Sequence, residues 1–243
     1  MTPHVVSAVF PPLDARLEAA AGLILAPLHA DVGSDHAALP LALLRAGRAE
    51  RIIIVEKTAG PLEVARQAVQ RCGLEARAEL RLGDGLAPLL PHELASVSLT
   101  GMGARTMLGI LGRGRAAGRV PEWLVTQPND DAGRLRLWAG AHGYHLTAER
   151  LAPGFWRYPV LRFEQRPGPD PAYAGLPAAA ALACGPHLLR QRHPLLFQEV
   201  RAQLRRLEGL ERHARPQTLS ELATVRSALA WLESVSAEEE TTR

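Results

Sequence analysis

Two acidic residues flank a glycine at the point where an apolar stretch gives way to a predicted helix. Asp31, Gly33, Asp35 and His36 lie within six consecutive residues that follow the apolar segment 23–28. A glycine here lets the backbone turn tightly and approach a ligand, as in the nucleotide-binding loops of parallel sheets. With one glycine and no lysine, the run matches neither the dinucleotide fingerprint nor a phosphate-cradling loop. Paired carboxylates suit a ligand with an ammonium or sulfonium group, although an ordinary acidic turn has the same composition.

Two further acids follow the next two predicted strands. Glu56 ends the β-branched run 52–55, 25 residues after the first acid of the loop, close to the spacing of about 20 expected for an acid that binds ribose hydroxyls. Asp84 and Gly85 follow the segment 78–82, where the carboxylate is placed to accept a hydrogen bond from an adenine amino group. Each acid alone is most often a turn or cap residue. Together they predict a pocket for a positively charged nucleoside such as S-adenosylmethionine.

Small and amide residues follow two more predicted strands. Gly101 and Gly103 leave room for a flat ring or a sulfonium close to the backbone, and Gln127 and Asn129 carry amides that can bind a base edge. Ligands of open α/β sheets bind at the carboxyl ends of the strands, so these residues are expected to border one cleft. Amino methyltransferases often carry an Asn/Asp-Pro-Pro-aromatic motif here, and Gln-Pro-Asn without an aromatic favours a ring nitrogen as methyl acceptor. Asp130 is expected to cap the helix that follows it.

The elements that must position these residues alternate as in a doubly wound α/β sheet. Strands are predicted at 28–32, 52–56, 78–82, 96–100 and 123–126, and helices at 13–25, 37–46, 61–72, 103–112 and 132–141. The segments Tyr144 to Arg150 and Trp156 to Phe163 are close enough to pair as an antiparallel hairpin at one edge. The result is a Rossmann-like sheet of the class I methyltransferase type. The order of the strands in space does not follow from the sequence.

Prolines and glycines between 166 and 171 end this pattern, because proline lacks a backbone donor and has a fixed φ. The expected division is a catalytic domain over 1–166, which binds S-adenosylmethionine, and a linker with a helical arm over 167–243. Apolar residues at helical spacing, divided by Pro216, predict two helices packed as an antiparallel, coiled-coil-like hairpin. Residues 187–226 hold eight arginines against four glutamates. Arginine binds phosphate well, but a solvated helix face has the same composition, so the arm is expected to be structural first and RNA-binding second.

Composition and cysteine usage fit an enzyme of a reducing compartment. Of the 243 residues 47% are hydrophobic, enough for a sizeable core. No apolar run reaches the length of about 18 residues that spans a membrane, and no basic leader precedes the apolar segment 19–28, so no signal peptide is predicted. Cys72 and Cys184 are far apart without a histidine cluster, which argues against a metal site. A cytoplasmic protein is therefore expected.

Taken in order, these motifs resemble the bacterial TrmK family of tRNA (adenine-22) N1-methyltransferases. The shared features are the block Asp31 to Pro40, Glu56 with Gly60-Pro61, Gly83 to Leu86, Gly101-Met-Gly, Gln127-Pro-Asn and Gly185-Pro186. The resemblance covers nearly the whole chain. It implies S-adenosylmethionine as methyl donor and N1 of a D-loop adenine of tRNA as acceptor. We further expect a monomer that acts without a metal and without a membrane. The resemblance also implies that Arg16 is the family arginine ahead of the first strand and contributes to the cofactor site.

In this interpretation Asp31 and Asp35, with His36 beside them, hold the methionine end of the cofactor, while Gln127 and Asn129 orient the target base. Neutral adenine N1 already has a lone pair, so positioning rather than a strong base is expected to accelerate transfer. Two alternatives stay open. The missing glycine triplet, and the absence of any lysine four residues after a tyrosine, count against a nicotinamide-dependent oxidoreductase. The intact acids count against a non-catalytic RNA-binding module with the same fold.

Overall fold

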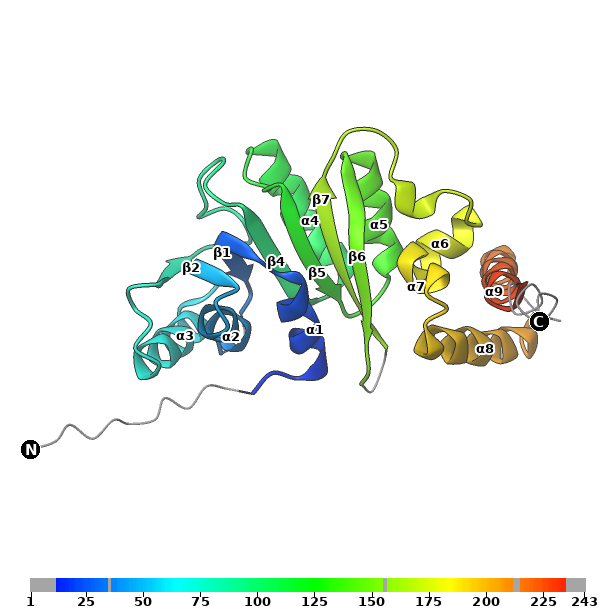
Figure 1. Ribbon diagram of the computed structural model, residues 1–243, viewed down its shortest axis with the longest axis horizontal. Coiled ribbons are helices and arrows are strands. Elements are labelled where there is room, and N and C mark those ends of the chain that lie inside the picture. The colour runs from blue at the N-terminus through cyan, green and yellow to red at the C-terminus, as the bar shows by residue number, and fades with distance from the viewer. Residues whose placement is uncertain (1–11, 35, 155–156, 212–214, 235–243) are drawn as a thin grey trace, which may run out of the picture.

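The computed structural model describes residues 12–34, 36–154, 157–211 and 215–234. Within these residues the chain forms one seven-stranded sheet with helices on both faces, and further helices gather beside one edge (Figure 1). The strands are β1 (Ala26–Val32), β2 (Ala49–Glu56), β3 (Ala78–Leu82), β4 (Ser96–Met102), β5 (Trp123–Pro128), β6 (Tyr144–Ala152) and β7 (Tyr158–Gln165). Their order is β3-β2-β1-β4-β5-β7-β6. β1 to β5 are parallel, and β7 runs antiparallel to both of its neighbours.

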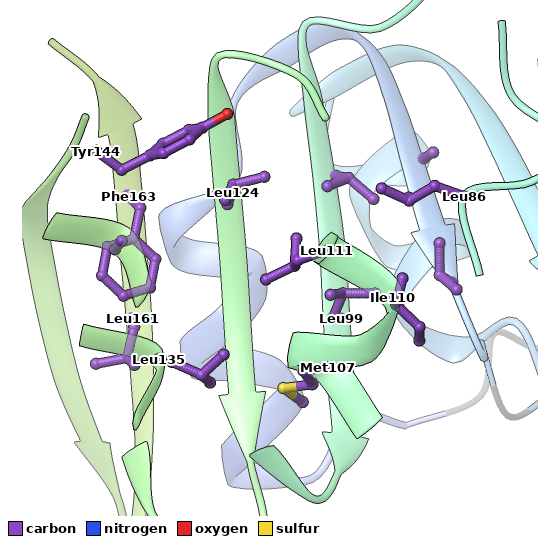
Figure 2. Packing of buried hydrophobic residues seen from close by; sticks show 14 of the residues in the cluster. Leu86, Leu99, Met107, Ile110, Leu111, Leu124, Leu135, Tyr144, Leu161 and Phe163 are labelled. Atoms are coloured by element: carbon purple, nitrogen blue, oxygen red, sulfur yellow. The ribbon is translucent and has the colours of Figure 1, made fainter. Parts of the chain in front are cut away.

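Alternating apolar residues on the central strands give each face of the sheet its own core. In β2, Ile53 and Val55 belong to one buried cluster and Ile52 and Ile54 to another, because successive side chains of a strand point to opposite faces. The first cluster lies under α4 (Ala104–Ala116) and α5 (Ala132–Ala141), as Figure 2 shows for its larger residues. The second lies under α1 (Ala15–Leu23), α2 (Ala38–Arg45) and α3 (Ala59–Arg71). Burial on both faces explains why these strands are almost continuously apolar in sequence.

The predicted doubly wound sheet is confirmed, including the antiparallel pair at its edge. Each strand and helix predicted up to residue 166 overlaps an element of the structure. β2 starts earlier than predicted, at Ala49, because its first residues, which include the polar Glu50 and Arg51, already pair with β1. β7 begins at Tyr158, and Trp156, the predicted start of that strand, lies outside the described residues. In the described part of the chain, no helix combines the length and the apolar character needed to cross a bilayer.

After β7 the chain forms the helical arm, which consists of η1 (Pro171–Tyr173), α6 (Ala178–Cys184), α7 (Pro186–Arg190), α8 (Pro194–Glu208) and α9 (Pro216–Ser234). The predicted apolar faces of α8 and α9 are buried together with residues of α6 and α7 in a third cluster. The sequence does not predict η1, α6 or α7, because each is too short to show a helical repeat.

The antiparallel, coiled-coil-like hairpin predicted for α8 and α9 is not confirmed. In Figure 1 α8 lies across the view whereas α9 is seen nearly end-on, so the two helices cross instead of running side by side. α9 packs against α6 as well as α8. Its buried residues Leu222, Val225, Ala228 and Leu232 share one cluster with both partners. The buried face of α9 is thus shared between two partners, and periodicity within α9 does not reveal the second partner.

A buried ion pair joins the helical arm to the sheet. Arg136 of α5 and Glu149 of β6 are 2.7 Å apart, and neither side chain is more than 1% exposed. Arg136 also donates to the carbonyls of Leu182 and Ala183 at the end of α6. Gly185 follows with a φ of +98°, and a Cβ at this position would overlap the carboxylate of Glu149. The glycine of the Gly-Pro motif is therefore required where the arm passes over the ion pair.

Candidate active site

The three acids predicted to form a pocket lie at the ends of three adjacent strands. Asp31 is the penultimate residue of β1 and Glu56 is the last residue of β2, while Asp84 lies two residues beyond the end of β3. Because these strands are parallel neighbours, their carboxyl ends share one edge of the sheet. The strand order changes direction between β1 and β4, which places this edge at the switch point where open α/β sheets bind ligands.

Asp31 is the most deeply buried of these acids, with 1% of its surface exposed. Its Oδ1 accepts a hydrogen bond from the hydroxyl of Ser98 on β4. Burial raises the pKa of Asp31 to about 6, against the opposing effect of the Ser98 hydrogen bond. The neighbouring Ser34 side chain also lowers the pKa of Asp31, although its hydroxyl and the carboxylate do not meet the geometry of a hydrogen bond. Among the described residues, Oδ2 of Asp31 and the hydroxyl of Ser34 are both buried without a hydrogen-bond partner, as expected of groups that face a ligand.

The loop after β1 is shaped by a glycine and by Glu56. Gly33 has a φ of +73°, and a Cβ there would lie 2.5 Å from the end of the Met102 side chain. The amide of Ser34 donates to Oε1 of Glu56 over 2.6 Å. Glu56, predicted to bind ribose, thus also fixes the loop with one of its oxygens. Asp35 lies outside the described residues, and His36 is exposed with a φ of +62°. A left-handed conformation is uncommon for a residue other than glycine, and residues in sparsely populated conformations cluster at functional sites.

Asp84 lies on a turn whose glycine packs against the core. Its carboxylate is about half exposed and is 3.6 Å from Nζ of Lys57 and 3.3 Å from the guanidinium of Arg113. Gly85 has a φ of +62°, and a Cβ there would come within 2.8 Å of Ile110 on α4. The turn is therefore held close to the sheet, while the carboxylate stays accessible at its edge.

Hydrogen bonds between the ends of β4 and β5 hold the residues predicted to contact the base. Gln127 is fully buried; its Oε1 accepts from the amide of Gly101 over 3.1 Å and its Nε2 donates to the carbonyl of Pro128 over 2.8 Å. Asn129 is exposed, and its Nδ2 donates to the carbonyl of Gly101 over 2.7 Å. Gly101 has a φ of +73° with open space where a side chain would be. Asn129 and Gly101 are therefore accessible at the carboxyl end of the sheet, whereas the amide of Gln127 is engaged within the protein.

Asp130 caps a different helix from the one predicted. Its Oδ1 accepts from the amide of Ala104 over 2.6 Å, so it caps the first turn of α4 rather than α5. A Cβ on Gly103 would lie 3.0 Å from Oδ2 of the same carboxylate. The small residue at 103 thus lets the β4 and β5 loops approach each other, which sequence spacing does not reveal.

Arg16 lies at the same edge of the sheet as the acids. It pairs with Asp14 at 2.6 Å, and its guanidinium lies 5.1 Å from the ring centre of Tyr158. Tyr158 begins β7, three residues before the residue that pairs with Thr126 near the end of β5. Arg16 is thus presented at the carboxyl edge, although its described contacts are with Asp14 and Tyr158 rather than with the three acids.

Ser98 is a site residue that the sequence analysis missed. It is fully buried and lies directly opposite Asp31 in the β1–β4 register. A serine within an apolar strand is an ordinary core residue when its neighbouring strand is unknown. Only the alternation of Ser96 and Ser98 on one face of that strand hints at a polar partner.

The site offers the hydrogen-bonding groups that S-adenosylmethionine requires. The buried oxygen of Asp31 that lacks a partner among the described residues suits a cationic amino acid group, and the carboxylates of Glu56 and Asp84 offer acceptors that suit ribose hydroxyls and an adenine amino group. A Cβ built on Gly101 would meet no atom within 4 Å, so the backbone at this strand end is open to a ligand. The residues of this edge therefore fit the cofactor.

The chain is similar to tRNA methyltransferases over most of its length. A family model described as TrmK, tRNA (adenine(22)-N(1))-methyltransferase, matches residues 29–234. The tRNA (adenine(22)-N(1))-methyltransferase of Bacillus subtilis is 28% identical over 181 residues, which cover 74% of this chain and 76% of that protein. The crystal structure of the B. subtilis m1A22 tRNA methyltransferase TrmK superposes with a TM-score of 0.76 and 28% identity, over 92% of this chain and 98% of the other.

A second solved structure contains the cofactor. Streptococcus pneumoniae Sp1610, crystallised in complex with S-adenosyl-L-methionine, superposes with a TM-score of 0.78 and 28% identity, over 90% of this chain and the whole of the other. A sheet of the methyltransferase order, three acids at adjacent strand ends and a family match over 29–234 agree with one another. The chain therefore belongs to the TrmK family of tRNA (adenine(22)-N(1))-methyltransferases.

Proposed function

We propose that this protein transfers a methyl group from S-adenosylmethionine to N1 of adenine 22 in the D-loop of tRNA. The observation that carries the proposal is the buried oxygen of Asp31 that has no hydrogen-bond partner among the described residues, at an edge shared with Glu56 and Asp84, in a chain of this family. A nicotinamide-dependent oxidoreductase and a non-catalytic RNA-binding module are the alternatives that the experiments below test.

Each acid is proposed to bind a different part of S-adenosylmethionine. Asp31, together with Asp35 and His36 of the same loop, holds the methionine end, Glu56 accepts from the ribose hydroxyls, and Asp84 accepts from the adenine amino group. When bound, S-adenosylmethionine supplies an electrophilic methyl group on a positively charged sulfur. Arg16 approaches this edge with its charge neutralised by Asp14, so we assign it to shaping the pocket beside Tyr158.

Asn129 and the backbone at Gly101 are proposed to orient the target adenine. Asn129 is exposed at the cleft, and Gly101 presents its backbone without a side chain. Gln127 holds both residues in place through its bonds to the amide of Gly101 and to the side chain of Asn129, so its role is positioning. N1 needs no deprotonation, and the ring becomes cationic on methylation. Carbonyl dipoles at the ends of β4 and β5 are suited to stabilise that charge.

The target base must leave its stack to reach this cleft. A cavity of about 710 Å³ lies beside the end of β5, between the sheet and helices α8 and α9. Asp130, Arg157 and Glu199 are among its lining residues. We propose that nucleotides next to the target enter this cavity, with the catalytic domain (1–166) and the arm (167–243) each forming one wall. Because the proposed substrate is tRNA, we propose that the enzyme acts in the cytoplasm, and we expect it to act as a monomer.

The decisive experiment maps methylated nucleosides in an unmodified tRNA transcript after incubation with protein and S-adenosylmethionine. Mass spectrometry is expected to find 1-methyladenosine at position 22 and no product in a matched transcript with guanosine there. Methylation at another atom or position would contradict the proposal. Absence of product despite binding of both ligands would favour the non-catalytic module, and calorimetric binding of NAD without binding of S-adenosylmethionine would favour the oxidoreductase.

A charge-reversal pair tests whether the arm contacts tRNA. Arg206 is exposed and its ion pair with Glu221 is long, at 3.3 Å. The Arg205→Glu/Arg206→Glu variant is expected to weaken tRNA binding by about tenfold at roughly 0.1 M salt and to flatten its salt dependence, while the affinity for S-adenosylmethionine stays unchanged. Arg66→Glu/Arg71→Glu on α3, at the far end of the sheet (Figure 1), is the matched control. Equal tRNA affinities for both double variants would confine the arm to a structural role.

A further inference from the structure

A continuous line of buried polar side chains leads along β1 and β4 to Asp31. Nδ1 of His29 lies 2.6 Å from the hydroxyl of Ser96, and Nε2 of the same ring lies 2.8 Å from the hydroxyl of Ser98. Ser98 in turn is hydrogen-bonded to Oδ1 of Asp31. His29 and Ser98 are fully buried, and Ser96 is 3% exposed. The parallel register sets His29 opposite Ser96 and Asp31 opposite Ser98, on one face of the two strands.

The protons of this line have one consistent arrangement when Asp31 is ionised. A carboxylate only accepts, so Ser98 must use its single proton to donate to Asp31. The oxygen of Ser98 then accepts from Nε2–H of His29. Burial lowers the pKa of His29 to about 3, so the ring is neutral and carries one proton. Nδ1 is therefore an acceptor, and Ser96 donates to it.

A protonated Asp31 permits the opposite direction. Its hydroxyl can donate to Ser98, Ser98 to Nε2, and Nδ1–H to Ser96, so the line has two arrangements that differ in the tautomer of His29. Other groups also act on Asp31: Glu56 on β2 disfavours its charge, and Ser34 favours it. Neither of these depends on the tautomer. The direction of the line is therefore coupled to the charge of Asp31.

We propose that His29, oriented by Ser96, is a positioning residue that directs the proton of Ser98 onto Asp31 and so keeps this carboxylate charged for the cationic end of S-adenosylmethionine. The inference rests on the proposed cofactor site. It assigns a role to three buried polar residues that do not reach the cleft themselves. A histidine between two serines suits this role, because only an imidazole has one nitrogen that donates and one that accepts across a rigid ring.

The test is the pH dependence of S-adenosylmethionine binding, measured by calorimetry on the full chain. Affinity for a cationic group is lost as the pH falls through the pKa of the ligand-free Asp31, which is about 6. Removing the hydroxyl that donates to the charged form raises this midpoint, so Ser98→Ala is expected to shift it upward by about one pH unit. The affinity of each protein at about pH 6.5 is divided by its own affinity at about pH 8.5. This ratio is expected to be roughly threefold lower for the variant than for wild type. Ser96→Ala is expected to shift the midpoint in the same direction by less.

Thr126→Val is the matched control, because Thr126 on β5 also carries a buried hydroxyl but has no hydrogen-bond partner among the described residues. Its pH profile is expected to be that of wild type. A merely structural role for Ser98 predicts weaker binding by the same factor at every pH, and that result would overturn the proposal. If wild type binds no S-adenosylmethionine at any pH, the proposed function itself fails, which is a different outcome from an unshifted Ser98→Ala profile.

A measurement on the wild-type protein covers the case in which Ser98→Ala does not fold. Nitrogen-15 NMR distinguishes the two neutral tautomers of histidine and the imidazolium, and His29→Gln identifies the resonances. At about pH 8 His29 is expected to be neutral and protonated at Nε2. Protonation at Nδ1, or an imidazolium, at that pH would contradict the proposed direction of the line.

Discussion

Replacing Asp31 with asparagine is expected to stabilise the ligand-free protein and to abolish cofactor binding. The carboxylate is buried, and one of its oxygens has no hydrogen-bond partner among the described residues. In the native state its pKa is raised from 3.8 to about 6. A carboxyl group with a raised native pKa costs stability once it ionises, so the contribution of Asp31 to stability is greatest below about pH 4, falls between about pH 4 and pH 6, and stays at its lowest value above that.

The size of this effect follows from the shift in pKa. About two units at 1.36 kcal/mol each correspond to about 3 kcal/mol of lost stability at neutral pH. Asparagine avoids this cost, but its amide group lacks an acceptor at the Oδ2 position, which costs about 1–3 kcal/mol. A net gain of about 1 kcal/mol is therefore expected for Asp31→Asn at pH 7.5, or roughly 2–4 °C in melting temperature for a chain of this size.

Thermal unfolding with and without S-adenosylmethionine, at pH 5 and pH 7.5, is the assay. The advantage of Asp31→Asn over wild type is expected to shrink at the lower pH, and added cofactor is expected to raise the melting temperature of wild type only. Asp84→Asn, at a half-exposed carboxylate, is the control and should change the stability of the ligand-free protein by less than about 0.5 kcal/mol. A variant less stable than wild type at both pH values, or one stabilised equally by the cofactor, would refute the reasoning.

Three further substitutions test other parts of the structure. Gly33→Ala is expected to cost about 1–3 kcal/mol and to weaken cofactor binding, because its φ is +73° and its Cβ would meet Met102; chemical denaturation measures the first effect and calorimetry the second. Arg136→Met is expected to cost about 3–5 kcal/mol because it leaves Glu149 charged and buried, and a double variant that also carries Glu149→Leu should recover much of the loss; an unchanged midpoint in the single variant would contradict this. Asn129→Ala is expected to lower kcat by about tenfold or more while the Kd for S-adenosylmethionine changes by less than about twofold; a loss confined to cofactor affinity would move Asn129 to the cofactor site.

Part of the candidate site could be predicted from the sequence because its signals are local. Gly33 and Gly101 are needed where the backbone takes a positive φ, and glycine is the residue that adopts it without cost. The β-branched run before Glu56 marks a strand buried on both faces, so the acid that ends it must lie at a sheet edge. Neither inference depends on which strands are neighbours.

The roles of several polar residues could not be predicted, because they depend on contacts between distant segments. Gln127 has the composition of a base-binding amide but is buried against Gly101, 26 residues away. Asp130 precedes α5 in sequence, yet it caps α4. In each case the hydrogen-bond partner belongs to the neighbouring strand end, and a buried polar group takes the partner that the packing brings to it.

By itself the sequence determined where strands end, which turns need glycine and which faces are apolar, because these properties arise from interactions within a few residues. Tertiary structure alone decided that β4, rather than β3, lies beside β1. That order results from the packing of helices on both faces of the sheet, and it brings Ser98 to Asp31 and His29 to Ser96. The proposed tautomer of His29 and the charge of Asp31 both depend on the pairing of β1 with β4, because hydrogen bonds between side chains of two strands form only when the strands are adjacent.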